Sequence, residues 1–151
     1  MLKPSKKMLF AIEAVLDIAY HAGGEPVQSR EITRRQGIPR RYLEQTLQQL
    51  VRAGILVGVR GPRGGYRLAR ERRRISVGEI VRVVRNLETI EDGTEEPPAS
   101  ALGRQVIRPM WGDLGEEIMA RLDGISIDEL CMRAYRDGVP SEAAQKLDFT
   151  I

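Results

Sequence analysis

The chain has 151 residues, 42% of them hydrophobic, and a formal net charge of +3, which suits one compact domain with an accessory element. Its single cysteine excludes an internal disulfide framework, and no run approaches the roughly 18 apolar residues of a membrane span. Residues 1–85 hold 18 Lys+Arg and 7 Asp+Glu, a net +11, whereas residues 86–151 hold 6 and 14, a net −8. Since 15 of those 18 cations are arginine, a residue suited to phosphate and guanine contacts, we expect only the first half to meet nucleic acid.

The first expected element is a helix over residues 6–20. An apolar run follows Lys3, Lys6 and Lys7, as in a signal peptide, but Glu13 and Asp17 interrupt this run, so we expect a cytoplasmic protein. The same two acids lie off the apolar face. That face, predicted to enter the core, consists of Leu9, Ile12, Leu16 and Ala19.

A helix-turn-helix is predicted next. Ser29 can cap a short helix that runs to Arg34, and Gly37 then stops it. Pro39 suits the first turn of the following helix. Helix, glycine-containing turn and helix is the order of the DNA-binding motif.

The second helix of this motif is strongly amphipathic. Leu43, Leu47, Leu50 and Val51 share one face, and Gly54 ends the helix where a left-handed residue is usually needed. The opposite face can hydrogen-bond base edges and phosphates. It carries Arg40, Arg41, Glu44, Gln45, Gln48 and Gln49.

Residues 55–57 and 66–68 are expected to form two strands of a hairpin with a basic tip. The tip, residues 61–65, reads GPRGG and supplies the positive φ angles and the fixed φ of a turn. Arg60 and Arg63 flank this turn or lie in it, where an arginine can enter a narrow minor groove. An ordinary solvated hairpin is the alternative, but the preceding motif favours a winged helix-turn-helix on duplex DNA.

The segment after the hairpin is less diagnostic. The cluster at residues 70–74 is either a solvated loop or a phosphate contact. Residues 76–79, SVGE, form a capping box for a helix that runs through Val84. Residues 88–100 are acidic, contain proline and have few apolar groups, so they predict a mobile loop.

A long apolar-faced helix is predicted over residues 102–122, with Pro109 at its start or at a kink. The DNA-binding module cannot cover this whole face, so the helix needs a partner surface. Folding back onto the first helix is the alternative. Residues 126–129, SIDE, form a second capping box, and residues 140–141 open a short final helix.

Three single residues have a functional and a structural interpretation. Cys131 is either a buried small hydrophobe or a redox thiol, which needs an electropositive, exposed setting. His21 suits a helix C-terminus as a cation and is a weak metal candidate. Trp111 belongs to the core or a dimer interface, with an effector pocket as the alternative. No G-x-S-x-G, P-loop, HExxH or paired-cysteine motif occurs, so the chain is not expected to be an enzyme.

The sequence resembles a known bacterial family over residues 5–87. AIEAVLDIAY, QGI, YLEQ, VRGPRGGY and ISVGEIVRVV stand in the order and spacing of the winged-helix family that includes the iron–sulfur cluster assembly repressor, the nitric-oxide-sensing repressor and the cysteine-metabolism repressor. A looser match continues through MWGDL and the long helix. The resemblance implies a cytoplasmic homodimer that binds a palindromic operator, usually as a repressor. It also implies that the long helix pairs with its twin, through Val106, Met110, Trp111, Leu114, Ile118 and Leu122.

One departure from the family concerns its cofactor. Many members hold an iron–sulfur cluster through three cysteines ahead of the long helix. Aligned on Trp111, the last of these falls near Gln105, and an acidic fourth ligand near Leu9. Neither residue is a plausible cluster ligand, so we expect no cofactor and no metal.

The resemblance also assigns roles at the DNA. Glu44 falls on a position that family members use to discriminate bases, and Arg60 on the wing arginine that enters the minor groove. Arg40 and Arg41 stand where many relatives carry small polar residues, so the operator is expected to differ. The predicted DNA-binding residues are Ser29, Arg40, Arg41, Tyr42, Glu44, Gln45, Gln48, Arg60, Gly61, Arg63, Gly64, Gly65 and Tyr66.

The sequence therefore predicts a mostly α protein with a small β-hairpin. Its expected parts are a winged helix-turn-helix at 1–87, an acidic mobile loop at 88–101, and a dimerisation helix with C-terminal helices at 102–151. The expected function is a homodimeric transcription regulator, a repressor without a cluster. The alternatives are a regulator that depends on a metabolic-enzyme partner or a small metabolite, and a thiol switch through Cys131.

Overall fold

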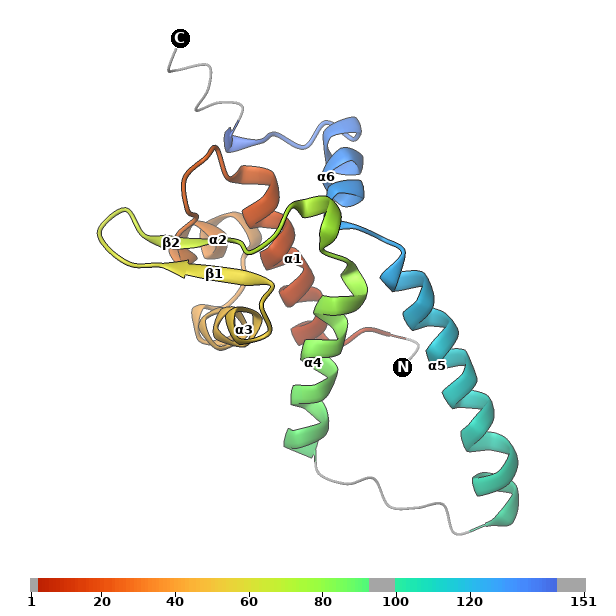
Figure 1. Cartoon of the computed structure of the whole chain (residues 1–151). Coiled ribbons are helices and arrows are strands. Elements are labelled where there is room, and N and C mark those ends of the chain that lie inside the picture. Colours follow the sequence, from red (N-terminus) through yellow and green to blue (C-terminus); the bar gives the residue numbers. More distant parts are fainter. Residues whose placement is uncertain (1–2, 93–99, 144–151) are drawn as a thin grey trace.

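The computed structural model describes residues 3–92 and 100–143. They form a mostly helical body with one antiparallel hairpin, which confirms the expected fold class. In Figure 1 the hairpin projects from one side of the body and α5 runs down the other. No helix among the described residues is long and apolar enough to cross a membrane. The elements are α1 (Lys6–His21), α2 (Ser29–Gln36), α3 (Arg40–Arg52), β1 (Leu56–Val59), β2 (Gly65–Leu68), the 3-10 turn η1 (Arg72–Arg74), α4 (Val77–Asp92), the π-helical turn η2 (Gly103–Ile107), α5 (Arg108–Asp123) and α6 (Ile127–Arg136).

A single apolar core joins these elements. Leu43, Leu47 and Leu50 on α3 are fully buried and Val51 lies at the core's edge, as their spacing predicted. The core includes Ile18 of α1, and further buried members are Ile32, Ile38, Ile55, Leu56, Ile75, Ile80, Val81, Val84 and Ile127.

The core-facing side of α1 differs from the prediction. Leu9 is exposed and the other three predicted core residues are only half-buried. Because α1 packs against α2, α3, α4 and α6, small residues fit where the helices approach closely. The face that is buried carries Ala11, Ala14, Val15 and Ile18.

Asp17 is also buried, although its charge predicted a position off the core. Its carboxylate accepts hydrogen bonds from Arg35 Nε and Nη2 at 2.9 and 2.7 Å and from Gln36 Nε2 at 2.8 Å. Its side chain is 0% exposed and that of Arg35 is 9% exposed. A bidentate pair of this kind satisfies the carboxylate and joins α1 to α2 inside the protein.

The turns of the helix-turn-helix follow the prediction, with one correction. Gln28, and not Ser29, is the N-cap of α2, and its backbone N donates to Glu31 Oε2 at 2.9 Å. Gly37 has φ 68° and Gly54 has φ 76°, so both stops use the left-handed conformation that favours glycine. Pro39 directly precedes α3 as its N-cap.

The wing strands lie close to their predicted bounds. Leu56 pairs with Leu68 and Val59 with Gly65, so β1 runs two residues further than expected. The segment before α2 adds a third, short strand contact, because Val27 and Tyr66 exchange two backbone hydrogen bonds of 2.8 Å. The wing is thereby attached to the start of α2.

The helix after the wing is longer than predicted. Its capping box is confirmed: Ser76 N donates to Glu79 Oε2 at 2.9 Å, and Glu79 N to Ser76 Oγ at 3.2 Å. However, α4 continues to Asp92, so residues 88–92 are helical and their assignment to a loop was wrong. Residues 93–99 of the predicted loop lie outside the described residues.

The long helix contains the irregularity that Pro109 predicted. Residues 103–107 form a π-helical turn, closed by Arg108 N donating to Gly103 O, and Pro109 follows in the first turn of α5. A proline nitrogen cannot donate, so the backbone departs from regular α geometry just before it.

The second predicted capping box is at α6, where Ser126 Oγ accepts from Glu129 N at 3.0 Å. Helical residues begin again at Glu142.

The Asp17–Arg35 pair gives a stability prediction. Changing Asp17 to Asn removes the charge that balances Arg35 inside the protein, so we expect a loss of about 3–5 kcal/mol in the free energy of unfolding. Urea denaturation followed by circular dichroism measures it. Glu13→Gln on the same helix is the control, because burial already raises the pKa of Glu13 and opposes its charge, and its cost is expected to stay within about 0.5 kcal/mol. Equal effects of the two changes would contradict the role given to Asp17.

Candidate nucleic-acid interface

The polar face of α3 is exposed, opposite its buried leucines. Arg40, Arg41, Tyr42, Glu44, Gln45 and Gln48 all lie on the surface, and Gln49 is half-buried. Arg40 Nε donates to Glu44 Oε1 at 3.0 Å. Both partners are at least half exposed, so this pair contributes little to stability and exchanges easily for another ligand.

The wing tip presents arginines on a tightly built turn. Arg60, Gly61 and Arg63 are exposed, and Gly61 has φ 108°, a conformation that favours glycine. A Cβ on Gly64 would lie 2.2 Å from Val59 O, and one on Gly65 2.5 Å from Val27 O. Both glycines are therefore needed for the close backbone packing of the wing.

Four of the predicted contact residues, including the half-buried Gly65, are less accessible than expected. Gly64 is buried, which argues against its predicted contact with DNA. Tyr66 is half-buried against the core and Ser29, in the first turn of α2, is also half-buried. These positions serve the fold of the wing and of α2 first.

The arginine cluster after the wing is held by carboxylates. Arg70 Nη2 lies 3.0 Å from Glu79 Oε1, and Arg72 Nε lies 2.7 Å from Asp128 Oδ1. Arg73 pairs with its neighbour Glu71. The sequence suggested a solvated loop or a phosphate contact for this cluster, and the structure shows ion pairs within the chain, which neither interpretation included.

The long helix exposes most of the predicted apolar face. Val106, Met110, Trp111, Leu114 and Ile118 are 39–54% exposed. Leu102 and Ile107 are exposed as well, and Ile107 was absent from the predicted set although it lies one turn from Trp111.

Leu122 is the exception in this set, because it is half-buried against the core of its own chain. Residues spaced by four advance around a helix by roughly 40° per step at 3.6 residues per turn. Residues spaced by four from Met110 therefore point outward at Met110 but toward the body at Leu122. Leu122 therefore packs against its own chain, and its place in a dimer interface stays a prediction.

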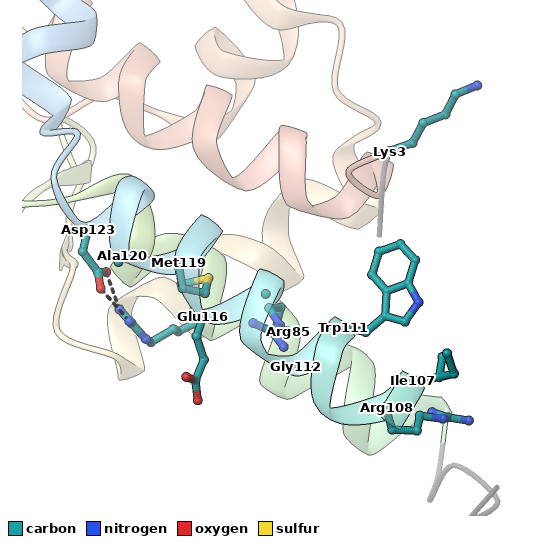
Figure 2. Close-up of a pocket in the computed structure, with 12 residues that line it drawn as sticks. Lys3, Arg85, Ile107, Arg108, Trp111, Gly112, Glu116, Met119, Ala120 and Asp123 are labelled. Carbon is teal, nitrogen blue, oxygen red and sulfur yellow. Dashed lines mark hydrogen bonds and ion pairs between the residues drawn. The ribbon is translucent and has the colours of Figure 1, made fainter. Parts of the chain in front are cut away.

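An open groove of about 1430 Å³ runs between α4 and α5. Figure 2 shows Asp123 at one end and Trp111, Ile107 and Arg108 toward the other. Arg82 Nη2 donates to Asp123 Oδ2 at 2.7 Å, which clamps α5 to α4. The groove is lined by Lys3, Arg82, Arg85, Ile107, Arg108, Trp111, Gly112, Gly115, Glu116, Met119, Ala120 and Asp123.

The sequence of this chain is similar to those of known proteins. The sequence model of the Rrf2 family, described as an iron-dependent transcriptional regulator, matches residues 4–133. The chain belongs to the Rrf2 family. It is 37% identical over 129 residues to the HTH-type transcriptional regulator IscR of Aliivibrio salmonicida, covering 85% of this chain and 77% of that protein. Its relatives are transcriptional regulators and not enzymes, so this Rrf2 protein is a DNA-binding transcriptional regulator.

Solved structures of the family have the same fold. T. potens IscR superposes with a TM-score of 0.72 at 34% identity, covering 92% of this chain and 93% of that one. CymR (YrzC), the global cysteine regulator of B. subtilis, superposes with a TM-score of 0.68 at 26% identity, covering 88% and 98%. The resemblance inferred from QGI, YLEQ and VRGPRGGY is thus confirmed.

The donor residues of this chain do not fit an iron–sulfur cluster. Such a cluster is held by several thiolates, and the chain has one cysteine, Cys131, which is buried in α6. Gln105 and Leu9, the positions aligned with family ligands, are exposed and carry an amide and an alkyl group. Among residues 3–92 and 100–143, no group of three His, Cys, Asp or Glu side chains could hold a metal ion.

Cys131 and His21 both lie in environments that oppose their charged forms. Burial raises the pKa of the Cys131 thiol, so the reactive thiolate is disfavoured and a small-hydrophobe role is supported. Burial, with Arg35 next, lowers the pKa of His21. His21 Nδ1 accepts from Glu142 N at 3.1 Å, so it is a neutral acceptor and the predicted cation at the end of α1 was wrong.

Proposed function

We propose that this Rrf2 protein is a homodimeric repressor that binds a palindromic operator without an iron–sulfur cluster. The observation that carries the DNA-binding part is the exposed polar face of α3 beside an arginine-bearing wing, in the half of the chain with a net charge of +11. α3 enters the major groove and the wing tip lies on the adjacent backbone and minor groove. By this reading α3 specifies bases, and the arginines supply sequence-independent affinity.

The dimer part of the proposal rests on the exposed face of α5. Four large apolar side chains on α5, with Val106 in the turn before it, would be costly to leave in water. A second copy of the same helix covers them in a two-fold interface, and a two-fold dimer requires an operator with two inverted half-sites. Repression and cytoplasmic location follow from the family resemblance. A partner enzyme or a metabolite as effector stays a prediction.

Glu44 and Arg60 have opposite roles in this proposal. A carboxylate repels phosphates, so Glu44 adds selectivity, through acceptance of a cytosine amino group, and little affinity. Its exposed pairing with Arg40 exchanges easily, so a base amino group can replace the guanidinium. Arg60 is exposed at the wing, where a cation contributes counterion release.

We therefore expect Glu44→Ala to change which operator bases are tolerated while leaving non-specific binding intact or slightly stronger. Arg60→Ala is expected to weaken binding by roughly 1–3 kcal/mol and to lower the salt slope by about one unit. Titrations on the operator and on scrambled duplex, at several salt concentrations, distinguish the two. If both variants lose the same affinity on both DNAs, or neither changes anything, the assignment is wrong.

The proposed dimer interface is tested by Ile118→Glu, which places a charge in the apolar seam and is expected to cost several kcal/mol of association. The variant should sediment as a monomer or become insoluble. Gln105→Glu adds the same charge on the same long helix, at an exposed site away from Ile118, and is expected to stay dimeric. A dimeric Ile118→Glu protein would place the interface elsewhere.

The cluster-free part is tested by metal analysis. Because the chain has a single, buried cysteine, protein purified without oxygen is expected to be colourless and to contain no stoichiometric iron or sulfide. Elemental analysis and visible absorption measure this. A visible charge-transfer band with matching iron and sulfide would refute the proposal.

A further inference from the structure

The C-terminal strap, residues 137–143, runs from the end of α6 past the end of α1 (Figure 1). Three hydrogen bonds attach it to the last turn of α1. Tyr20 Oη donates to Val139 O at 2.5 Å, Ser141 Oγ donates to Tyr20 O at 2.7 Å, and Glu142 N donates to His21 Nδ1 at 3.1 Å. The strap therefore bonds to both backbone and side-chain atoms in the last turn of α1.

The Glu142 carboxylate attaches the strap to α2 as well. Its Oε1 lies 2.8 Å from Arg34 Nη2 and its Oε2 lies 2.6 Å from Arg35 Nη1. Arg35 in turn holds the buried Asp17. The charges alternate from Asp17 through Arg35 and Glu142 to Arg34, across α1, α2 and the strap.

The position of α2 controls both surfaces proposed to meet DNA. Its C-terminal end leads through Gly37 directly into α3. At its other end, Val27 is bonded to Tyr66 of β2, and Gln28 Nε2 donates to Pro62 O at 3.4 Å in the wing tip. A small shift of α2 therefore moves α3 and the wing relative to each other.

We propose that Glu142 and His21 are positioning residues for DNA binding: they hold the strap on α2, and the docked strap fixes the orientation of α2 and with it the spacing of α3 and the wing. This inference rests on the proposed function of α3 and the wing. Neither residue touches DNA in this proposal.

The bond to His21 makes docking dependent on pH. Nδ1 accepts the Glu142 N–H only while it carries no proton. His21 faces Arg34 and Arg35 on α2, Asp17 on its own helix and Glu142 on the strap, and Tyr20 packs edge-on against its ring. A proton on Nδ1 removes the acceptor and adds a cation beside Arg35.

The lowered pKa of His21 determines the direction in which strap docking changes with pH. Burial lowers the pKa of His21 in the docked state, so the free strap binds the proton more readily than the docked one. Docking is therefore strongest above the ordinary histidine pKa of about 6.5 and weakens as pH falls below it. The Arg34 hydrogen bond lowers the pKa of Glu142, so this carboxylate remains ionised through the same range.

The experiment compares Glu142→Gln with Glu129→Gln, an exposed position on α6 that loses the same charge. The probe is a duplex that the wild-type protein selects from a randomised pool at pH 8. Glu142→Gln is expected to bind it roughly 3- to 30-fold more weakly, with faster hydrogen exchange at the α2 amides, while Glu129→Gln binds as wild type does. Wild-type affinity and α2 protection should fall from pH 8 to pH 6. His21→Asn, which keeps an acceptor near Nδ1 but does not titrate, should remove that pH dependence.

Binding and α2 exchange in Glu142→Gln that equal those of Glu129→Gln would overturn the proposal, as would an unchanged pH profile in His21→Asn. If Glu142→Gln does not fold, Ser141→Ala tests the same attachment without a charge change, with weaker binding and faster α2 exchange expected and wild-type behaviour contradicting it. If the wild-type protein selects no duplex, the proposed function fails, and α2 exchange alone still decides whether the strap orders α2.

Discussion

The structure depends on one buried ion pair, Asp17 with Arg35. An ion without a partner at this depth costs several kcal/mol, so α1 and α2 are stable together only when carboxylate and guanidinium are aligned. That alignment fixes the angle between the two helices in a way that apolar contacts alone do not, because apolar contacts have no direction. Since α3 follows α2 after one glycine turn, the pair also sets where α3 leaves the core.

The acidic half of the chain completes this arrangement. From its net charge of −8, this half is expected not to contact DNA. Three of its carboxylates instead pair with arginines of the basic half: Asp123 with Arg82, Asp128 with Arg72, and Glu142 with Arg34 and Arg35. These pairs neutralise cations on the body. Within the described residues no carboxylate pairs with Arg41, Arg60 or Arg63, so α3 and the wing carry positive charge without a carboxylate partner.

The sequence predicts the parts of this fold that local chemistry decides. Gly37 and Gly54 take left-handed conformations, Ser76 and Glu79 form a capping box, and Leu43, Leu47 and Leu50 share a face, because turns, caps and helical periodicity involve only neighbouring residues.

Tertiary contacts decide the features that the sequence left undetermined. The buried face of α1 is set by four helices around it, so Ala14 and Asp17 are buried there while the bulkier Leu9 is exposed. Gly64 faces Val59 O across a hairpin turn, which a residue-by-residue reading of φ does not reveal. The Glu142 contacts join residues more than 100 positions apart, and no sequence spacing indicates them. In the candidate site, the sequence predicted the exposed face of α3. It did not predict the ion pairs that join Asp17, Arg35, Glu142 and Arg34.

The geometry of α5 constrains the proposed dimer further. Met110, Leu114 and Ile118 of α5 follow each other at intervals of four, so they form one ridge of the i±4n type. When two helices interdigitate such ridges, their axes cross at about −50°, unlike the roughly +20° of a coiled coil. Two crossing α5 helices would diverge from a central contact and would hold the two DNA-binding modules apart. In the proposed dimer, half-site separation on the operator would depend on the crossing angle of α5, while base preference would depend on α3, so a substitution could change one property without the other.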